Sequence, residues 1–415
     1  MPKPDPEDFH RALTASIEDP YPVYRRYRDA GALHRVLRPG SGREPEWLVL
    51  RYEEAAAVLA GRGFGRRASV AGVGPETSVG IVPPRYRVLS ALVDNWLVFM
   101  DPPRHTRLRA VVAECLAARM RSGTRARVRE IVRRLVDRLA AEPTVDLVER
   151  YAALIPVLTM LELLGVPSGD QDWLRERAAV FQRATTFRPG PREPRLVAAE
   201  EAARALAEYF RAALAERRAT PGNDLLSALL AELWDDDLAA EDVLIGTCVH
   251  LLLGGHEATT TALSKSALLL LRQPGVLATL RSRPELVPAA VDEFIRYDSP
   301  AQMVTRWAYQ DETVGGHRIR RGDKVTVVLG AANRDPDRFE QPDTVRFDRD
   351  GHRHCGFGMG AHYCLGSALG RIEVEAGVEG LLTMLPGLRL ADDAVPYRQD
   401  LVFHGPRRLA TTRRE

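Results

Sequence analysis

Cys364 is the residue whose type and setting point most clearly to chemistry, because it ends a loop crowded with glycine just before a helical pattern begins. Glycines at positions 356, 358 and 360 allow backbone conformations closed to other residues and let a flat ligand come close. At a helix N-terminus, the dipole and the free N–H groups favour a thiolate. A lone thiolate held in this way suits one axial position of a haem iron, where it donates electron density that favours O–O cleavage.

Two other interpretations of this loop have to be weighed. A single cysteine is often only a buried small hydrophobe. Zinc is the second rival, because three histidines and two cysteines lie close together in the sequence, namely His352, His354, Cys355, His362 and Cys364. Structural zinc sites usually bring their ligands in short paired spacings such as C-x-x-C. That spacing is absent here, so zinc is the more distant alternative.

The loop resembles the haem-binding loop of the cytochrome P450 superfamily, whose pattern is F-G-x-G-x-H-x-C-x-G. Every fixed position of that pattern is present, namely Phe357, Gly358, Gly360, His362, Cys364 and Gly366. The resemblance implies haem b as the cofactor and Cys364 as the iron ligand. It also implies that Phe357 and Gly358 contact the haem and that His362 contacts one of its propionates.

Composition limits the class of protein. The chain has 415 residues with 45% hydrophobic and 27% charged content, and no linker or repeat divides it, so we expect a single domain over 1–415. A net charge of +2 argues against a nucleic-acid-binding protein. The N-terminus lacks the apolar core of a signal peptide or anchor, and the apolar stretches are too short to span a membrane. Four cysteines form no disulfide framework, which favours the cytoplasm.

Helical periodicity dominates the elements that must position the loop. Strands are expected at 46–50, at 304–329 with a turn at Gly315 and Gly316, and at 387–415. Helices are expected to fill most of 102–297 and again 365–385. Among them, Asp101 is the expected N-cap of one helix, and a long apolar helix is expected over 240–271. The resemblance implies a mainly α cytochrome P450 fold with small β-sheets, in which the haem lies between the long central helix and the cysteine loop.

Glu293 and Arg296 are spaced to pair on one face of a helix. The simplest interpretation is an exposed ion pair of little energetic value. The sequence also resembles the E-x-x-R motif of the family, which holds the region behind the haem loop. The third member of that motif is usually an arginine before the loop. Arg346 is the candidate and Arg349 its rival, and we expect the trio to be structural.

Further haem contacts follow from the resemblance. His105 and Arg109 are four residues apart, so they project to one side of a helix. Alone they would be ordinary surface residues, but their segment resembles the propionate-binding helix of the family. Arg306 matches another propionate arginine, and His354 could join these contacts.

The long helix carries the string Gly254-Gly255-His256-Glu257-Ala258-Thr259. It resembles the family motif A/G-G-x-D/E-T-T, where the acid and the alcohol handle dioxygen and its protons. Gly255 matches a position beside the haem, and Glu257 matches the acid. The alcohol position is Ala258, and Thr259 cannot replace it without a register change, since each residue turns about 100° around a helix. These three positions, Glu257, Ala258 and Thr259, are the candidate catalytic residues.

The predicted function is therefore a haem-thiolate monooxygenase that uses dioxygen to hydroxylate or epoxidise an apolar natural product, such as a macrolide, another polyketide or a peptide. It would act in bacterial specialised metabolism, as a monomer, with electrons from a separate ferredoxin and ferredoxin reductase. Arginines between positions 104 and 138 are a candidate docking face for the ferredoxin. Two alternatives are an oxidase-type P450 that couples aromatic rings or forms C–C bonds without inserting oxygen, and a non-catalytic haem-binding protein.

Overall fold

The structure is a computed structural model that describes residues 8–37, 45–73, 82–185, 193–233, 241–349, 353–400 and 402–413. Its contacts divide the chain into two compact units, each assembled from separate stretches of sequence. The first unit holds Met1–Gly65, Arg129–Ile155 and Ala258–Glu415, and the second holds Arg66–Val128 and Pro156–Glu257. The single domain expected over 1–415 stays a prediction.

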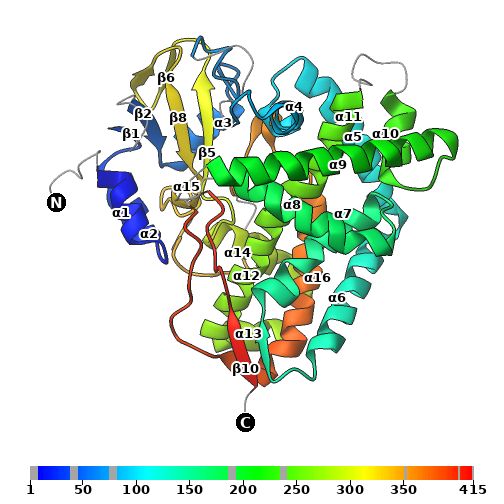
Figure 1. Cartoon of the computed structure of the whole chain (residues 1–415). Helices are drawn as coiled ribbons and strands as arrows, with labels where there is room; N and C mark the ends of the chain where they lie inside the picture. The colour runs from blue at the N-terminus through cyan, green and yellow to red at the C-terminus, as the bar shows by residue number, and fades with distance from the viewer. Residues whose placement is uncertain are drawn as a thin grey trace. The chain divides into compact units, whose positions relative to one another are not determined.

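The first unit contains the largest sheet, whose five strands are visible in Figure 1. In their order across the sheet they are β1 (Leu33–Leu37), β2 (Pro45–Val49), β8 (Lys324–Val328), β5 (Met303–Ala308) and β3 (Phe64–Gly65). Only β2 and β8 run parallel. Successive strand residues point to opposite faces, so Val49 and Val327 enter one core cluster while Leu48 and Val328 enter another.

Two smaller sheets complete the β-structure described for this unit. One has the strand order β4 (Thr144–Asp146), β10 (Ala410–Arg413), β9 (Leu388–Leu390), and the other pairs β6 (Glu312–Val314) with β7 (His317–Ile319). The β6–β7 turn is made by Gly315 and Gly316, whose φ angles are 54° and 77°. Positive φ at both positions is what a two-residue hairpin turn requires, so the turn expected from these glycines is confirmed.

The first unit also contains α-helices. They are α1 (Phe9–Ala15), α2 (Tyr21–Ala30), α3 (Tyr52–Ala60), α6 (Arg125–Leu139), α12 (His256–Arg272), α13 (Pro274–Ser282), α14 (Val287–Tyr297), α15 (Leu329–Ala332) and α16 (Ser367–Met384), of which α6 and α12 begin in the second unit. A Cβ at Gly377 of α16 would collide with Leu263 of α12, so a glycine is needed for the two helices to pack this closely. Tyr151, in the helical turn Val148–Ala152, donates a hydrogen bond to the Gly377 carbonyl of α16 (2.6 Å).

The described part of the second unit contains helices and loops but no β-strand. Its helices are α4 (Arg87–Asp94), α5 (Arg104–Arg119), α7 (Leu154–Leu163), α8 (Gln171–Thr185), α9 (Glu193–Ala219), α10 (Leu225–Leu233) and α11 (Glu241–Gly254). The long helix α9 packs along α8 (Figure 1). It buries a stripe of apolar residues at helical spacing, among them Leu196, Ala203, Phe210 and Leu214.

Two expectations about these elements were wrong. The helix expected over 240–271 is interrupted at Gly255, so that α11 and α12 are separate helices. Asp101 is not an N-cap by its side chain, because its carboxylate accepts hydrogen bonds from the backbone N–H groups of Arg66 (3.0 Å) and Arg67 (3.2 Å). The helix that it was expected to cap, α5, begins only at Arg104.

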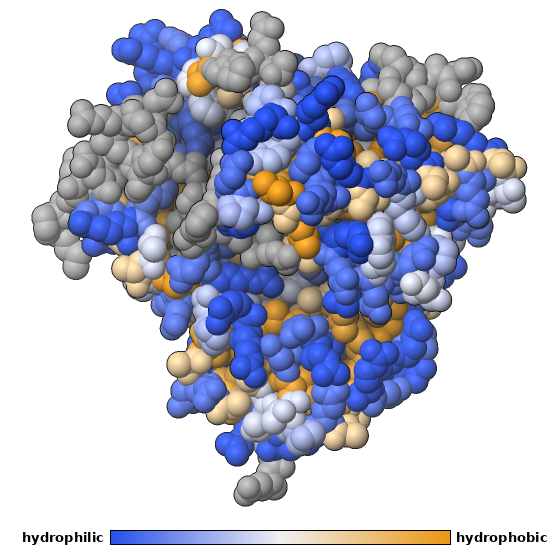
Figure 2. Space-filling model, viewed as in Figure 1, coloured by the Kyte–Doolittle hydropathy of each residue, from blue (hydrophilic) through white to orange (hydrophobic). Residues whose placement is uncertain are grey.

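The face drawn in Figure 2 is mostly hydrophilic, with hydrophobic residues scattered over it. Among the described residues, the large hydrophobic side chains that are exposed are Val70, Val98 and Val197. None of the helices in the described ranges combines the length and the hydrophobicity needed to span a lipid bilayer.

Candidate active site

The cysteine loop is closed by its own backbone. The N–H of Cys364 donates a hydrogen bond to the carbonyl of Phe357 (2.8 Å), and α16 begins three residues after Cys364. Gly358 and Gly360 have φ angles of 69° and 67°, which residues with a Cβ rarely adopt. A Cβ at Gly360 would also lie 2.6 Å from the carbonyl oxygen of Leu59, near the C-terminus of α3. Two of the loop glycines are therefore required by the backbone.

Cys364 differs from the other cysteines in its exposure. Its thiol is exposed, whereas Cys115, Cys248 and Cys355 are buried. Burial raises the pKa of Cys248 and of Cys355 to about 12, so both stay neutral thiols. Within the described ranges, no group of three or more His, Cys, Asp or Glu side chains is placed to hold a metal ion, and His352 lies outside those ranges.

The surroundings of Cys364 fit a flat ligand bound through sulfur. A Cβ added at Gly366, two residues after the cysteine, would meet no atom within 4 Å. Gly255 belongs to the second unit, at the break between α11 and α12, where an added Cβ would also meet no atom within 4 Å. His362, in the turn before Cys364, is half-buried. The open space beside an exposed thiol is what a haem-thiolate site needs.

Asp292 of α14 stabilises the cysteine loop through contacts with residues on either side of it. Its carboxylate accepts a hydrogen bond from Arg371 Nε (2.8 Å) and lies 3.5 Å from His354 Nε2. Although burial acts in the opposite direction, the contact with His354 and the charge of Arg371 hold the pKa of Asp292 below its usual value. The Arg371 guanidinium lies over the Phe357 ring, 4.4 Å from its centroid. His354 thus holds the start of the loop, and its contact with a propionate stays a prediction.

Glu293, the next residue of α14, forms a buried ion pair. Its carboxylate accepts two hydrogen bonds from Arg296, at 2.7 and 2.8 Å, and both side chains are almost fully buried. Arg296 also donates to the carbonyls of Asn333 (2.9 Å) and Pro342 (2.9 Å), in the segment before the loop. The alternative of an exposed pair is therefore excluded.

The third arginine is Arg349 and not Arg346, which corrects the sequence-based choice. Arg349 Nε donates to Glu293 (3.0 Å), and its guanidinium also reaches three backbone carbonyls. The side chain of Arg346 pairs instead with the exposed carboxylates of Glu340 and Asp348. Only the backbone N–H of Arg346 reaches Glu293 (2.9 Å).

The remaining predicted haem contacts lie in different units. In the second unit, His105 is buried on α5, and its pKa is lowered by burial and by the charge of Arg109. This confirms that His105 and Arg109 share a face of the helix. In the first unit, Arg306 is buried on β5, where one guanidinium nitrogen donates to the carbonyl of Thr305 (2.9 Å). Their contacts with haem propionates stay predictions.

A side chain that the sequence did not reveal contacts the residues on both sides of the break between α11 and α12. Gln182 of α8 donates to the carbonyl of Leu253 (3.5 Å), and its amide oxygen lies 3.1 Å from His256 Nδ1. Glu257 and Ala258 follow in the first turn of α12, and the Glu257 side chain is buried. A carboxylate is stabilised in this position by the positive end of the helix dipole.

Thr259 faces a second residue that was missed. Its hydroxyl donates to Glu373 of α16 (3.3 Å), and Glu373 is buried. Burial raises the pKa of Glu373 to about 8, partly offset by this hydrogen bond, so the side chain is mostly a neutral acid at pH 7. Glu373 lies four residues after Leu369 and four before Gly377, which places it on the buried stripe of α16. This helical spacing was the feature of the sequence from which the burial of Glu373 could have been predicted.

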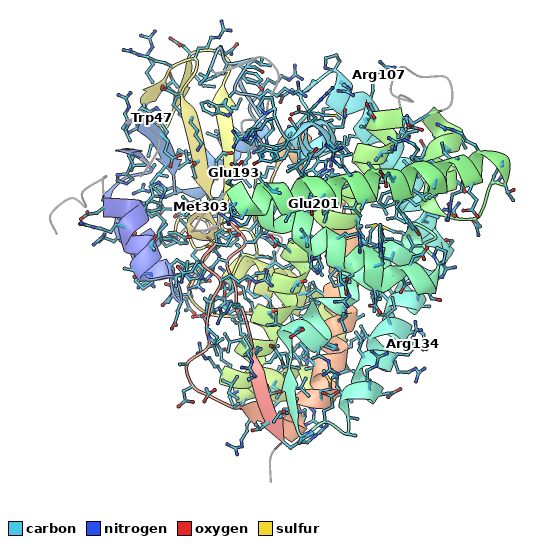
Figure 3. All side chains as sticks on the ribbon, viewed as in Figure 1. Trp47, Arg107, Arg134, Glu193, Glu201 and Met303 are labelled. Atoms are coloured by element: carbon cyan, nitrogen blue, oxygen red, sulfur yellow. The ribbon has the colours of Figure 1, made fainter. Side chains whose placement is uncertain are left out.

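The arginines of α6 are largely paired with acids. Arg129 forms two hydrogen bonds with Glu379 of α16, at 2.9 and 2.7 Å. Arg133 and Arg134 both contact Glu130, and Arg134 projects away from α6 in Figure 3. Each of these guanidinium groups is at least half exposed. The ion pairs reduce the positive charge available on this face, so it is a weaker docking candidate than the sequence suggested.

The roles of the two rival arginines can be separated by mutation. Arg349→Ala should lower the free energy of unfolding by about 3 kcal/mol, because it leaves a buried carboxylate without one of its partners. Arg346→Ala should cost less than about 1 kcal/mol, because exposed ion pairs contribute little. Urea unfolding of the holoenzymes measures both values. Equal losses in the two variants would show that Glu293 does not depend on Arg349.

The raised pKa of Glu373 predicts a pH dependence of stability. Between about pH 4.3, where an unperturbed glutamate titrates, and about pH 8, the folded state binds a proton that the unfolded state has lost. Stability therefore falls as the pH rises through this window, by up to about 1.4 kcal/mol per pH unit from this group. Glu373→Gln should remove this contribution, so its stability relative to wild type should increase with pH. Thermal unfolding from pH 5.5 to 8.5 tests this, and parallel curves would contradict it.

Comparison with known proteins agrees with this geometry. A family model described as cytochrome P450 matches residues 279–385. The chain is 33% identical to the biotin biosynthesis cytochrome P450 of Bacillus subtilis (strain 168), over 97% of this chain and 98% of that protein. It is 36% identical to the mycinamicin IV hydroxylase/epoxidase of Micromonospora griseorubida, over 93% and 94%.

A solved structure shows the same likeness in three dimensions. The crystal structure of P450BioI in complex with an acyl carrier protein carrying hexadec-9Z-enoic acid superposes with a TM-score of 0.86 and 31% identity. The match covers 96% of this chain and 100% of that one. Similarity of this degree over almost the entire length of several proteins establishes the mainly α fold with small sheets and the haem b cofactor. The chain belongs to the cytochrome P450 family of haem-thiolate monooxygenases.

Proposed function

We propose that this P450 hydroxylates or epoxidises an apolar natural product, a macrolide, another polyketide or a peptide, in bacterial specialised metabolism. The observation that carries the proposal is the loop of Cys364, in which an exposed thiol stands beside open space at the start of α16. The relative named for hydroxylation and epoxidation of mycinamicin IV supports both the reaction and the macrolide class.

Some residues of the chain would bind the haem, and others would supply protons for the reaction. Haem iron with a thiolate ligand supplies the activation of dioxygen. Cys364 provides the thiolate, and Phe357, Gly358 and Gly255 line the cofactor. The propionates would be bound by His105, Arg109, Arg306 and His362, with His354 as a further candidate.

Ala258 bears on how protons would be supplied to dioxygen. Alanine offers no hydrogen bond at the position where the family has an alcohol. Thr259 does not take that place, because its hydroxyl is directed to Glu373. The protons then come through an ordered water or a hydroxyl of the substrate, with the buried carboxylate of Glu257 holding the donor in position.

Electrons come from an acidic ferredoxin and its reductase. A cavity of about 390 Å³ in the first unit lies next to the cysteine loop, and five arginines and a histidine line it together with two acids and four uncharged residues. Arg353 in this cavity is exposed. The other four arginines pair with acids, so Arg353 is the main cation that this cavity presents to an acidic partner protein, whose encounter such a charge accelerates. The protein acts as a monomer in the cytoplasm.

The function is tested by turnover of the holoenzyme with a ferredoxin, its reductase and NADPH, using mycinamicin IV and other macrolactones that change the haem spin state on binding. The product should gain one oxygen atom, derived from labelled dioxygen, and omitting the ferredoxin should abolish it. Thr259→Ala should form product as efficiently per NADPH as wild type, since its hydroxyl serves Glu373.

Each contrary result has a definite meaning. A product that has lost two hydrogens without gaining oxygen would indicate an oxidase-type P450. Failure to consume NADPH in the presence of a bound macrolactone would indicate a haem-binding protein without catalysis. A large rise in hydrogen peroxide in Thr259→Ala would show that Thr259 carries the protons, against the proposed route.

A further inference from the structure

An aromatic stack in the second unit brings together side chains from three elements. Trp96 lies between Phe99, Phe181 of α8 and His250 of α11, with ring centroids 6.0, 5.6 and 5.2 Å away. The planes of Trp96 and His250 differ by 14°, so the two rings lie nearly parallel. Neither Trp96 nor His250 takes part in the chemistry described above.

The backbone is built to bring these rings together. A Cβ at Gly246 of α11 would lie 2.7 Å from the Cβ of Asn95, so only glycine permits this approach. Trp96 follows Asn95 directly, and His250 lies four residues, about one turn, after Gly246. The close packing of α11 on the segment after α4 therefore fixes the stack in place.

Two nitrogen atoms of the stack are buried without a hydrogen-bond partner. Trp96 Nε1 and His250 Nδ1 are both in this state, and the Trp96 side chain is only 8% exposed. Thr247 Oγ1, on the adjacent turn of α11, is also buried without a partner. Leaving a buried donor unsatisfied is costly, and native structures rarely do so without a purpose.

The chemistry of these atoms limits what they can bind. An indole N–H only donates a hydrogen bond, so its partner must be an acceptor. Burial lowers the pKa of His250 to about 4, so the imidazole is neutral near pH 7 and does not require an anion. The matching group is therefore a neutral oxygen acceptor, such as the carbonyl of a ketone or a lactone.

The position of His250 relates the stack to the bound substrate. His250 lies one turn before Gly254, and a Cβ at Gly254 would be 3.4 Å from two atoms of the imidazole ring. The ring therefore lies against the face of α11 at Gly254, the last residue before the break at Gly255. We infer that Trp96 and His250 are specificity-determining residues that bind a carbonyl oxygen of an otherwise apolar substrate. This inference rests on the proposed function, in which that helix face borders the substrate.

The test uses probes anchored on the haem iron, so that binding does not depend on knowing the natural substrate. They are imidazoles with an alkyl tail that carries a ketone at successive positions, each matched by an isostere in which a methylidene group replaces the carbonyl oxygen. Affinity is measured for the holoenzyme from the Soret shift caused by nitrogen ligation. At one or two tail positions the ketone should bind wild type about fivefold to tenfold more tightly than its isostere.

Conservative variants then assign this preference to the stack. Trp96→Phe and His250→Phe keep an aromatic ring but remove the nitrogen, and each should bring the ketone-to-isostere ratio close to one. Trp173→Phe, the same substitution at a tryptophan of α8 outside the stack, should leave the ratio unchanged. The inference is overturned if no tail position shows a preference in wild type, or if the preference survives in both variants. A holoenzyme whose carbon monoxide complex lacks the thiolate band would instead contradict the proposed function.

Discussion

The buried carboxylate of Glu293 is the interaction on which the arrangement around Cys364 depends. Taking two charges out of water costs several kcal/mol per ion, and only complete hydrogen bonding compensates for this. The structure meets that condition, since Glu293 accepts bonds from Arg296, Arg349 and the backbone of Arg346. Arg296 in turn donates to carbonyls of the segment before the loop. The irregular segment before the loop is fixed in place because its backbone carbonyls accept the hydrogen bonds that the buried guanidinium of Arg296 requires.

The adjacent residue extends this constraint to the loop itself. Asp292 binds Arg371, in the first turn and a half of α16, and approaches His354, at the start of the loop. A single turn of α14 thus holds both the segment before the loop and the two ends of the loop. The positive φ angles of Gly358 and Gly360 and the hydrogen bond from Cys364 to Phe357 then determine where the sulfur lies.

A different kind of interaction joins α12 to α16. Thr259 and Glu373 form a buried pair with one titratable member that is mostly neutral at pH 7. In the proposed proton route, the threonine one position past the usual alcohol does not replace it, because its hydroxyl donates to Glu373 of the neighbouring helix. The helix that follows the thiolate and the helix that carries Glu257 are therefore coupled through a proton-binding group.

The sequence predicted the helical fold, most of the strands, the hairpin turn and the Glu293–Arg296 pair, because these follow from local periodicity and from fixed spacing. It missed the strands β1, β3 and β4. It did not distinguish Arg349 from Arg346, because in an irregular segment the spacing of residues does not indicate which side chain points toward Glu293. Glu373 was missed because an acid on an apolar helix face has no partner close to it in the sequence. Gln182 was missed because the residues that it contacts, Leu253 and His256, are far from it in the sequence. The break at Gly255 was missed because helical periodicity continues on both sides of it.

The central claim is that Cys364 is the thiolate ligand. The carbon monoxide complex of the reduced holoenzyme tests it most directly, with Cys364→Ser compared against Cys355→Ser. Wild type and Cys355→Ser should both show the strongly red-shifted Soret band of thiolate ligation, because Cys355 is a buried neutral thiol. Cys364→Ser should lose that band. Its persistence in Cys364→Ser, or its loss only in Cys355→Ser, would contradict the account.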